Sequence, residues 1–388
     1  MPKVLRIINR FNIGGPTYNA TFLTGFLSDE YQTLLIGGLP EKGESDSLYI
    51  PEMYGVKPIL IKELQRTPNI FSDIKAYRKI KKIIKEFKPD IVHTHAAKAG
   101  ALGRRAAFSC KVPIIVHTFH GHVFHSYFGQ LKTFIYKWIE RKLAKKSTGI
   151  IAISETQKKE LSLIHQICEE KKIKVINLGF DLDRFMNFSI ETRQNLRQKY
   201  RIKEDEIALA IIGRFAPIKN HHFFFDVLEN ILTKTKRKIK VFVVGDGETR
   251  EVIENRASKI NNRFGDVVFL TSWIKDVYNF NQAMEIICLT SDNEGTPVSL
   301  IEAQASSLPV ITTNVGGVND IMLDGISGFI IDKGDLKEYS EKLQYLIEND
   351  EIRKVMGEKG KDFVKETFHY KRLCKEVELY YKELLTND

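Results

Sequence analysis

Two glutamates near a predicted helix start are the residues whose spacing most clearly indicates chemistry. In the stretch EGTPVSLIE, Glu294 precedes a Gly-Thr-Pro turn and Glu302 lies one to two turns into an apolar helix. Thr296 suits the N-cap and Pro297 the first helical position, so free N–H groups and a positive dipole end would face a ligand such as a diphosphate. The carboxylates can accept hydrogen bonds from sugar hydroxyls. The same spacing also fits a glutamate that only supports the helix dipole.

Two further loops follow apolar strands and carry groups suited to phosphates. In GRFAPIKN, Arg214 and Lys219 are two cations on one turn. Such a pair can clamp a diphosphate and stabilise the charge that grows on a leaving phosphate, although a solvated basic loop is the alternative. In VVGDGE, Gly245 and Gly247 allow the backbone to approach a ligand closely, which is a weak signal by itself.

The N-terminal half offers a glycine turn and a group of histidines. Gly14 and Gly15 separate the first strand from the first helix without the GxGxxG spacing of a dinucleotide site. The histidines are His93, His95, His117, His120, His122 and His125. No HExxH motif accompanies them, so a metal site is disfavoured, and we expect His120 to donate a hydrogen bond to a sugar.

Apolar strands alternate with helical segments through both halves of the chain, which predicts an α/β protein. The weakly patterned stretch from about residue 179 to 204 separates two such series. We therefore expect two Rossmann-like, doubly wound parallel sheets facing across a cleft, with ligands at the carboxyl ends of the strands. The predicted domains are residues 1–185, residues 186–367, and a C-terminal helix in 368–388 that crosses back to the first domain.

The composition is that of an ordinary soluble protein. The 388 residues are 43% hydrophobic and 28% charged, and no apolar run reaches the ~18 residues needed to span a bilayer. The four cysteines are scattered and have neither metal-binding nor disulfide spacing. These features predict a cytoplasmic protein.

Charge is distributed unevenly along the chain. Residues 1–185 contain 30 Lys and Arg against 17 Asp and Glu, a net charge of +13, whereas the remainder has 29 against 32, a net charge of −3. A basic amphipathic helix around residues 73–88 includes Lys79 and Lys82, and we expect it to meet anionic lipid on the inner face of the membrane. The alternative is a core helix with solvated lysines.

Phe124 and Tyr127 are predicted to line the acceptor entrance. A nucleic-acid partner is disfavoured because no binding motif is present.

Taken together, these motifs resemble the retaining glycosyltransferases of the GT-B fold, specifically glycosyltransferase family 4. Glu294 and Glu302 match the family's Glu-x7-Glu hallmark, and Arg214 and Lys219 match its basic loop. Further matches are Val244 to Glu248, Pro309 to Gly317, the Gly14-Gly15 turn, His120, and NLGFDLDRF, in which Leu178-Gly179-Phe180 departs from the usual Gly-Val. The last match accounts for Asp181 and Asp183 without a metal.

The resemblance implies a role for each matched residue. Arg214 and Lys219 would neutralise the donor diphosphate, Glu302 would hold the ribose, and Glu294 would hold the transferred sugar. Trp273 and Ile274 would contact the base. The stretch Gly295, Thr296, Pro297 and Val298 would offer N–H groups to the sugar or phosphate, although Pro297 itself has none.

The resemblance also implies the reaction. It predicts metal-independent, cofactor-free transfer of a sugar, from a UDP-hexose or UDP-N-acetylhexosamine, to a saccharide hydroxyl on a lipid-linked acceptor in bacterial surface polysaccharide or glycan synthesis. The alternatives are an enzyme like the UDP-N-acetylglucosamine 2-epimerases, which share this architecture, and a non-catalytic relative that only binds a nucleotide-sugar.

Overall fold

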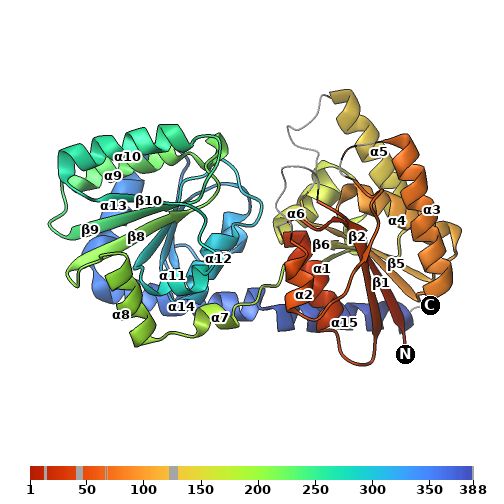
Figure 1. The fold of residues 1–388 in the computed structure, drawn as a ribbon. Coiled ribbons are helices and arrows are strands. Elements are labelled where there is room, and N and C mark those ends of the chain that lie inside the picture. Colours follow the sequence, from red (N-terminus) through yellow and green to blue (C-terminus); the bar gives the residue numbers. More distant parts are fainter. Residues whose placement is uncertain (13–14, 41–46, 66, 68, 122–129, 387–388) are drawn as a thin grey trace. The chain divides into compact units, whose positions relative to one another are not determined.

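The computed structural model describes residues 1–12, 15–40, 47–65, 67, 69–121 and 130–386 (Figure 1). The chain divides into two compact units. Unit 1 comprises Met1–Phe180 together with Phe368–Asp388, and unit 2 comprises Asp181–Thr367. Each unit is built around its own parallel sheet, so the predicted pair of Rossmann-like α/β folds is confirmed.

The sheet of unit 1 has the strand order β3-β2-β1-β4-β5-β6-β7 in the described residues, and every neighbouring pair is parallel. Its central strands are buried along nearly their whole length because both faces of the sheet are covered by helices. The strands are β1 (Lys3–Arg10), β2 (Gln32–Gly38), β3 (Ile59–Leu60), β4 (Ile91–His95), β5 (Ile114–Phe119), β6 (Gly149–Ala152) and β7 (Ile173–Val175).

Helices α3 and α4 cover one face of this sheet, where Ile80 and Ile84 pack with Val92 and Ile115. Helix α4 also contacts α5, so α3 and α5 flank it (Figure 1). The helices of unit 1 are α1 (Gly15–Gly25), α2 (Tyr49–Met53), α3 (Ile70–Phe87), α4 (Ala97–Ser109), α5 (Gln130–Lys146), α6 (Glu155–Lys159) and α15 (Tyr370–Thr386). None of the described helices combines the length and hydropathy needed to cross a bilayer.

The C-terminal helix α15 packs on the other face of the unit 1 sheet. Leu373 and Val377 join Val4 and Ile114 in one buried cluster. The chain rejoins unit 1 through a short parallel pairing of Phe180 with His369, in which two backbone hydrogen bonds form. Helix α15 is therefore part of the core of unit 1, although most of the preceding helix belongs to unit 2.

A buried polar contact ties α15 to the sheet. The Tyr381 hydroxyl lies 2.5 Å from Nδ1 of His93, and Nε2 of His93 lies 2.7 Å from the Thr118 hydroxyl. The guanidinium of Arg6 is also buried here, 6.0 Å from the Tyr381 ring. Burial lowers the pKa of His93 well below its ordinary value, and the nearby Arg6 charge adds to this effect. The imidazole is therefore neutral at pH 7.

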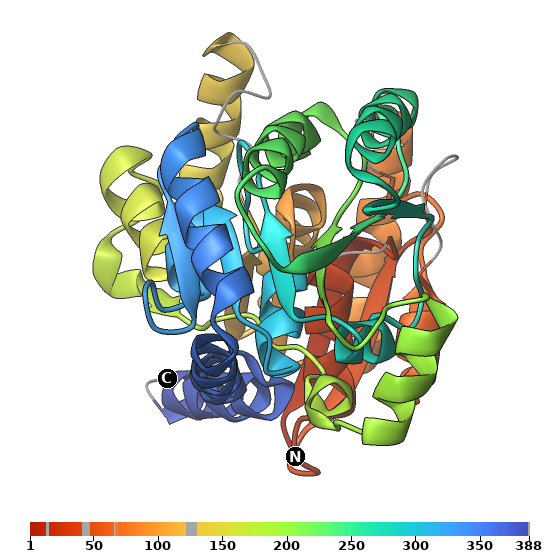
Figure 2. The ribbon, with the colours of Figure 1, turned by 90° about the vertical axis from the view of Figure 1, so that its left-hand side faces the viewer.

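The sheet of unit 2 has the strand order β10-β9-β8-β11-β12-β13 in the described residues, again entirely parallel. Helices α9, α10 and α13 contribute to one large apolar cluster on one of its faces (Figure 2). The strands are β8 (Glu206–Ile212), β9 (Lys238–Val244), β10 (Val268–Thr271), β11 (Ile286–Leu289), β12 (Val310–Thr313) and β13 (Gly328–Ile331). The helices are α7 (Asp183–Met186), α8 (Ile190–Lys199), α9 (His221–Leu232), α10 (Arg250–Phe264), α11 (Val277–Gln282), α12 (Val298–Ala305), α13 (Leu336–Glu348) and α14 (Asp350–Phe368).

The contact between Tyr381 and His93 predicts the stability of a matched pair of variants. Tyr381→Phe leaves a buried ring nitrogen of His93 without its partner, so the free energy of unfolding should fall by about 1–3 kcal/mol. Tyr380→Phe removes a neighbouring hydroxyl for which the described structure shows no hydrogen bond, and it should change stability by less than about 0.5 kcal/mol. Urea unfolding at pH 7 measures both, and equal losses would contradict the prediction.

Candidate functional site

The predicted donor-binding residues of unit 2 lie in loops at one edge of its sheet. Because all its strands are parallel, the loops after β8, β9, β10 and β11 emerge at the same carboxyl edge. Strand β8 pairs with β9 on one side and with β11 on the other, so the chain leaves β8 and β11 in opposite directions. In doubly wound sheets this switch point is the usual place for a ligand.

Lys219 and Glu294 meet at this switch point. Lys219 ends a 3-10 turn, Pro217–Lys219, after β8, and its Nζ lies 2.5 Å from Oε1 of Glu294 in the loop after β11. The same carboxylate oxygen accepts a hydrogen bond of 2.6 Å from the Ser291 hydroxyl. Both side chains of the ion pair are mostly buried, so solvent screens their attraction only in part.

Neighbouring polar residues fix the Lys219 loop on strand β11. The Thr290 hydroxyl donates to the backbone carbonyls of Lys219 and Asn220, at 3.2 and 3.1 Å. Asn220 has a left-handed backbone, with φ 46°, and its side chain accepts from the Phe223 N–H to cap α9. Its amide also donates to Asp292 at 3.2 Å. The sequence analysis did not single out these residues, although the polar run TSDNEG directly after a buried strand was an available signal.

Two glycines of the predicted PVITTNVGG motif support the backbone of Glu294. A Cβ added at Gly316, where φ is 53°, would lie 1.7 Å from the Glu294 carbonyl oxygen. The Gly317 N–H donates to that same carbonyl at 3.2 Å. Only glycine allows this approach, so the loop after β12 holds Glu294 in place through its main chain.

Helix α12 begins one residue later than the sequence predicted. Its N-cap is Pro297 rather than Thr296, and its first residue is Val298. No side chain caps it, and the side chain of Pro297 has no acceptor for the first-turn N–H groups. The Leu300 N–H donates to the Pro297 carbonyl at 3.2 Å, so the N–H groups of Val298 and Ser299 are those that the described structure leaves for a ligand at the helix start, where the dipole favours an anion.

Glu302 lies in the second turn of α12. Part of its side chain remains accessible, but the surrounding protein raises the pKa of its carboxyl to about 8 through burial. Within the described residues no cation is paired with it. The carboxyl is therefore largely protonated at pH 7 in the free protein, and a ligand that donates hydrogen bonds to it would favour the carboxylate.

The two glycines of VVGDGE are needed for the close packing of two loops. Gly245 and Gly247 have φ values of 147° and 153°, and a Cβ on either would lie within 2.3 Å of a backbone oxygen, Gly213 O or Phe215 O respectively. The loops after β8 and β9 can therefore pack together, joined by a 2.9 Å hydrogen bond from the Phe215 N–H to the Asp246 carbonyl. This packing fixes the start of the Arg214 loop.

Arg214 and Trp273 are the exposed members of the predicted set. Arg214 follows β8, and no ion pair to it is formed within the described part of the chain. Trp273 follows β10 with 57% of its surface exposed, and Ile274 beside it is partly exposed. Exposure at this edge leaves the Arg214 charge and the Trp273 ring available to a ligand.

In unit 1, the carboxyl ends of β4 and β5 bring two predicted histidines together. His95 Nδ1 lies 2.9 Å from His120 Nε2, and burial lowers the pKa of His120 to about 3. His120 is therefore neutral, and among the described residues its buried Nδ1 has no hydrogen-bond partner. His117 instead contacts the Thr94 hydroxyl at 2.8 Å, in the core. Gly15 begins α1 with ordinary packing against Leu178.

The other predicted residues either lie outside the described part of the chain or lie apart from these arrangements. Gly14, His122, Phe124, His125 and Tyr127 lie outside the described residues. Lys79 and Lys82 of α3 are exposed and form ion pairs, at 2.7 Å with Glu63 and at 3.7 Å with Glu86. Among the described residues, no three His, Cys, Asp or Glu side chains are grouped as a metal site would require.

Comparisons with known proteins extend over most of the chain. Residues 21–184 match the model of "Glycosyltransferase Family 4" and residues 192–363 match "Glycosyl transferases group 1". The chain is 30% identical over 323 residues to the capsular polysaccharide biosynthesis glycosyltransferase CapM of Staphylococcus aureus, covering 83% of this chain and 84% of CapM. It is 29% identical over 335 residues to UDP-Gal:alpha-D-GlcNAc-diphosphoundecaprenol alpha-1,3-galactosyltransferase of Escherichia coli, covering 86% and 85%.

Solved structures share the whole architecture. HepE of Anabaena in complex with UDP aligns with a TM-score of 0.81 at 18% identity, covering 98% of this chain and 100% of HepE. A glycosyltransferase of Rickettsia africae aligns with a TM-score of 0.82 at 21% identity, covering 100% and 99%. These likenesses establish the GT-B fold, and the sequence matches establish the lineage. The chain is a glycosyltransferase that belongs to family 4, among the group 1 glycosyl transferases.

Proposed function

We propose that this enzyme transfers a sugar from a UDP-sugar to a hydroxyl of a lipid-linked saccharide, with retention of anomeric configuration and without a metal, in bacterial surface polysaccharide or glycan synthesis. The observation that carries the proposal is the 2.5 Å contact between Lys219 and Glu294 beside the start of α12. There a cation, a carboxylate and free N–H groups lie at the switch point of one sheet.

The names of similar proteins support a UDP-sugar as the donor. The Escherichia coli relative is named for UDP-Gal as its donor, and HepE has been solved with UDP and with UDP-glucose. The same relative is named for a diphosphoundecaprenol-linked saccharide as its acceptor, and CapM is named for capsular polysaccharide biosynthesis. A hexose or N-acetylhexosamine donor and a lipid-linked acceptor follow as our proposal for this chain.

Departure of the diphosphate is the step that needs most help. Breaking the anomeric C–O bond leaves negative charge on the diphosphate and positive charge on the sugar ring. Arg214, Lys219 and the first-turn N–H groups of α12 would stabilise the developing negative charge. No divalent metal is needed in this scheme, because the two cations and the helix dipole already supply positive charge to the leaving group.

In the free enzyme, Lys219 and Glu294 are paired with each other. A diphosphate that binds Lys219 would weaken its pairing with Glu294, so the carboxylate becomes available to accept hydrogen bonds from the sugar hydroxyls. The Ser291 hydroxyl, 2.6 Å away, keeps the carboxylate oriented during this exchange. In this proposal, donor binding itself assembles the sugar subsite.

Transfer then proceeds on the face of the sugar that the diphosphate leaves. The acceptor hydroxyl attacks the anomeric carbon from that face, and the departing phosphate oxygen takes its proton. A double displacement would instead require a protein nucleophile at the anomeric carbon, and the resemblance offers no candidate for that role. This front-side course retains the anomeric configuration.

The remaining predicted residues complete the binding of donor and acceptor. Glu302 would accept two hydrogen bonds from the ribose diol, and the Trp273 ring with the Ile274 backbone would border the base. The neutral His120 would donate to the sugar through Nδ1, because its Nε2 already contacts His95. Meeting a lipid-linked acceptor would place the enzyme on the cytoplasmic face of the membrane.

Replacing Lys219 by alanine tests the leaving-group role. The variant should lose about 10²–10³-fold in kcat at saturating donor, because one stabilising charge is removed. Lys234→Ala is the control, since Lys234 is a lysine of the same unit that contacts only Asn230 in the described structure. Circular dichroism should show both variants folded. Normal turnover by Lys219→Ala would remove this residue from the mechanism.

The raised pKa of Glu302 predicts that donor binding depends on pH. Its pKa is about 8 in the free enzyme, and the ribose favours the carboxylate, so binding must release a proton. The affinity for UDP should therefore rise about tenfold per pH unit towards pH 8 and then level off. Titration calorimetry of the wild type and of Glu302→Gln measures this. The glutamine variant should retain only the dependence that belongs to the UDP phosphates, and identical profiles would exclude Glu302.

Product analysis tests the proposed reaction as a whole. A thermal-shift screen of nucleotide-sugars first identifies the donor, because a ligand that binds the native state raises its melting temperature. With that donor and a diphosphate-linked lipid saccharide, NMR should show an α linkage from an α-configured donor, and EDTA should not slow turnover. An inverted product or loss of activity in EDTA would contradict the mechanism. Release of a 2-epimer from donor alone would favour the epimerase alternative.

A further inference from the structure

Three imidazoles form a row on the face of the unit 1 sheet that α15 covers. His93 and His95 are two residues apart on β4, so their side chains share one face, and their ring centres are 4.3 Å apart. His120 follows the neighbouring strand β5, and its Nε2 lies 2.9 Å from Nδ1 of His95. This imidazole row therefore leads from the interior of the unit to the carboxyl edge of its sheet.

The contact between His95 and His120 links the positions of their protons. Burial lowers the pKa of both side chains, so each imidazole is neutral and has one N–H and one bare nitrogen. A hydrogen bond between the two rings places one proton between them. The second proton must then be at one of two ends, on the inner nitrogen, Nε2 of His95, or on the outer nitrogen, Nδ1 of His120.

The two end nitrogens have different access to a partner. Neither makes a hydrogen bond within the described part of the chain. The His95 side chain is completely buried, whereas His120 is partly exposed beside the carboxyl edge of the sheet. A buried N–H without a partner is unfavourable, and only at the outer nitrogen could a ligand at this edge supply one. A bound ligand therefore favours the second proton on Nδ1 of His120.

The charge of Arg6 favours the same arrangement before any ligand binds. Arg6 pairs in register with His93 on the adjacent strand, so its backbone lies further from the carboxyl edge than that of His95. Its charge lowers the pKa of both His93 and His95. Moving the second proton from the inner to the outer nitrogen takes positive charge away from Arg6.

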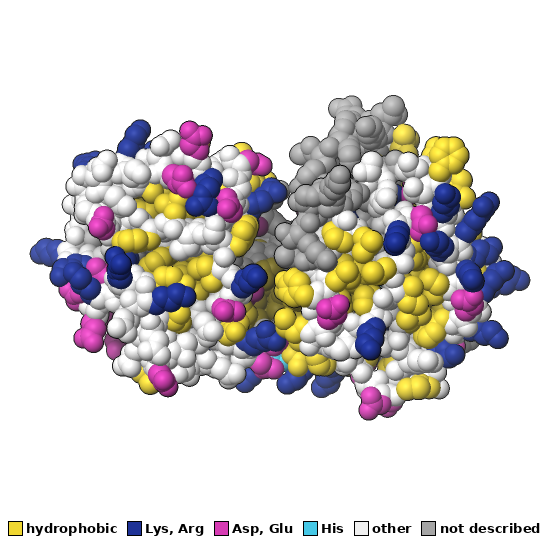
Figure 3. Space-filling view, viewed as in Figure 1, with side chains coloured by type: hydrophobic (Ala, Val, Ile, Leu, Met, Phe, Trp, Pro, Cys, Tyr) yellow, Lys and Arg dark blue, Asp and Glu magenta, His cyan; other side chains and the backbone are white. Residues whose placement is uncertain are grey.

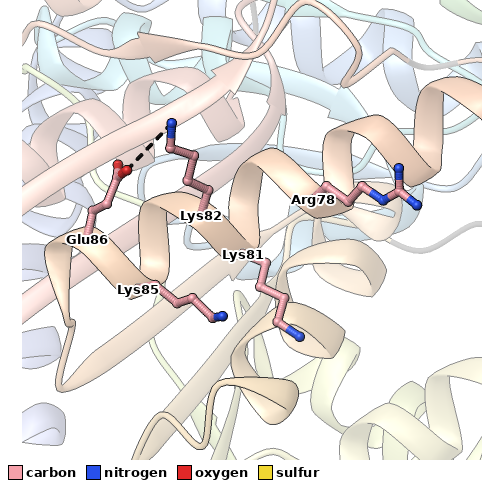
Figure 4. Close-up of a pocket in the computed structure, with 5 residues that line it drawn as sticks. All are labelled: Arg78, Lys81, Lys82, Lys85 and Glu86. Atoms are coloured by element: carbon pink, nitrogen blue, oxygen red, sulfur yellow. Dashed lines mark ion pairs between the residues drawn. The ribbon is translucent and has the colours of Figure 1, made fainter.

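Arg6 differs from the other cations of unit 1 in its surroundings. On the face shown in Figure 3, Lys and Arg side chains of this unit stand at the surface. Figure 4 shows cations of α3 around a shallow depression, where Lys82 is paired with Glu86. Solvent and salt screen such charges. The Arg6 side chain is completely buried, so its field acts on the imidazole row with little screening.

His95 is needed because a histidine by itself favours the other form. An isolated neutral histidine side chain has its proton mainly on Nε2, which would leave Nδ1 of His120 bare. The hydrogen bond made by one ring nitrogen determines which nitrogen carries the proton. When Nδ1–H of His95 donates to Nε2 of His120, the proton of His120 stays on Nδ1.

We propose that His95 is a positioning residue that, together with the charge of Arg6, keeps the proton of His120 on Nδ1, from which it is donated to an oxygen of the transferred sugar. His95 acts through His120 and need not touch the substrate itself. The donation to a sugar rests on the proposed function, whereas the position of the proton in the free protein does not. The two parts can therefore be tested separately.

NMR of the protein with 15N-labelled histidine, without a ligand, tests the position of the proton. Bare and protonated ring nitrogens differ clearly in 15N chemical shift, and His120→Gln identifies the signals of His120 by their loss. In the wild type Nδ1 should be protonated and Nε2 bare. In His95→Leu the proton should move to Nε2. A bare Nδ1 in the wild type, which needs no variant to detect, would overturn the proposal, as would an unchanged proton position in His95→Leu.

His95→Asn is the conservative variant that separates hydrogen bonding from packing. Asparagine and leucine are similar in size, but the amide nitrogen of asparagine is two bonds from Cβ, as Nδ1 of histidine is, and it can donate to His120. His95→Asn should therefore keep the proton on Nδ1 of His120. Loss of that proton position in His95→Asn and His95→Leu alike would show that the imidazole acts only through packing, which would overturn the proposal.

Kinetics with the donor found by thermal shift test the consequence for transfer. His95→Leu should lower kcat/KM about tenfold to a hundredfold, as expected when one hydrogen bond in a buried site is lost, and His95→Asn should recover most of it. The affinity for UDP, which lacks the sugar, should not change. Tyr381→Phe is the control, because it removes the partner of His93 but not the contact of His95 with His120. An equal loss of kcat/KM in Tyr381→Phe would contradict the specific role of His95.

A double-mutant cycle shows whether His95 acts through His120. In a His120→Gln background, His95→Leu should cause no further loss of kcat/KM, because the group that it positions is already absent. A full additional loss would mean that His95 acts independently, which would overturn the proposal. If the wild type transferred sugar from no donor, the proposed function would fail, and the NMR spectra would still decide the position of the proton.

Discussion

The ion pair between Lys219 and Glu294 joins the two loops on which the proposed donor site depends. Those loops leave the paired strands β8 and β11, after which the chain turns in opposite directions. The Asp292 N–H donates to the Ile218 carbonyl and the Thr290 hydroxyl donates to the Lys219 carbonyl, so the two loops are also joined through their main chains. A substrate anion can compete for the lysine without disturbing these backbone contacts. The site can therefore exchange one partner for another while its scaffold remains fixed.

The glycines around this site are needed because backbones pack closely there, and not because the loops must be flexible. Gly245 and Gly247 allow the loop after β9 to lie on the loop after β8, and Gly316 allows the loop after β12 to lie on Glu294. Each close approach is between two backbones, and a side chain at any of these positions would force them apart. The loops are thus fixed by their main chains, so the side chains of Arg214 and Lys219 are not needed to hold the close approaches between them.

The sheet of unit 1 contains buried imidazoles and a buried guanidinium within its central strands. Burial and the Arg6 charge keep His93 and His95 neutral, and burial does the same for His120. Neutral imidazoles can pair with one another or with the Tyr381 hydroxyl without the penalty of an unpaired buried charge. The excess positive charge of the N-terminal half lies instead on exposed faces, notably the outward face of α3 with Lys82 and Lys85, where solvent can accommodate it.

The amino-acid sequence determined the fold class and the residues that are predicted to form the donor site. Strand and helix periodicity are local properties, and Glu294, Glu302, Arg214 and Lys219 belong to short motifs whose spacing survives in the linear chain. The tertiary structure decided what these residues contact. Strand order brought Lys219 to Glu294 across 75 residues, and dense packing raised the pKa of Glu302. It also decided which apolar residues of α3 form the core and which are exposed, because helical periodicity alone does not specify what packs against each face.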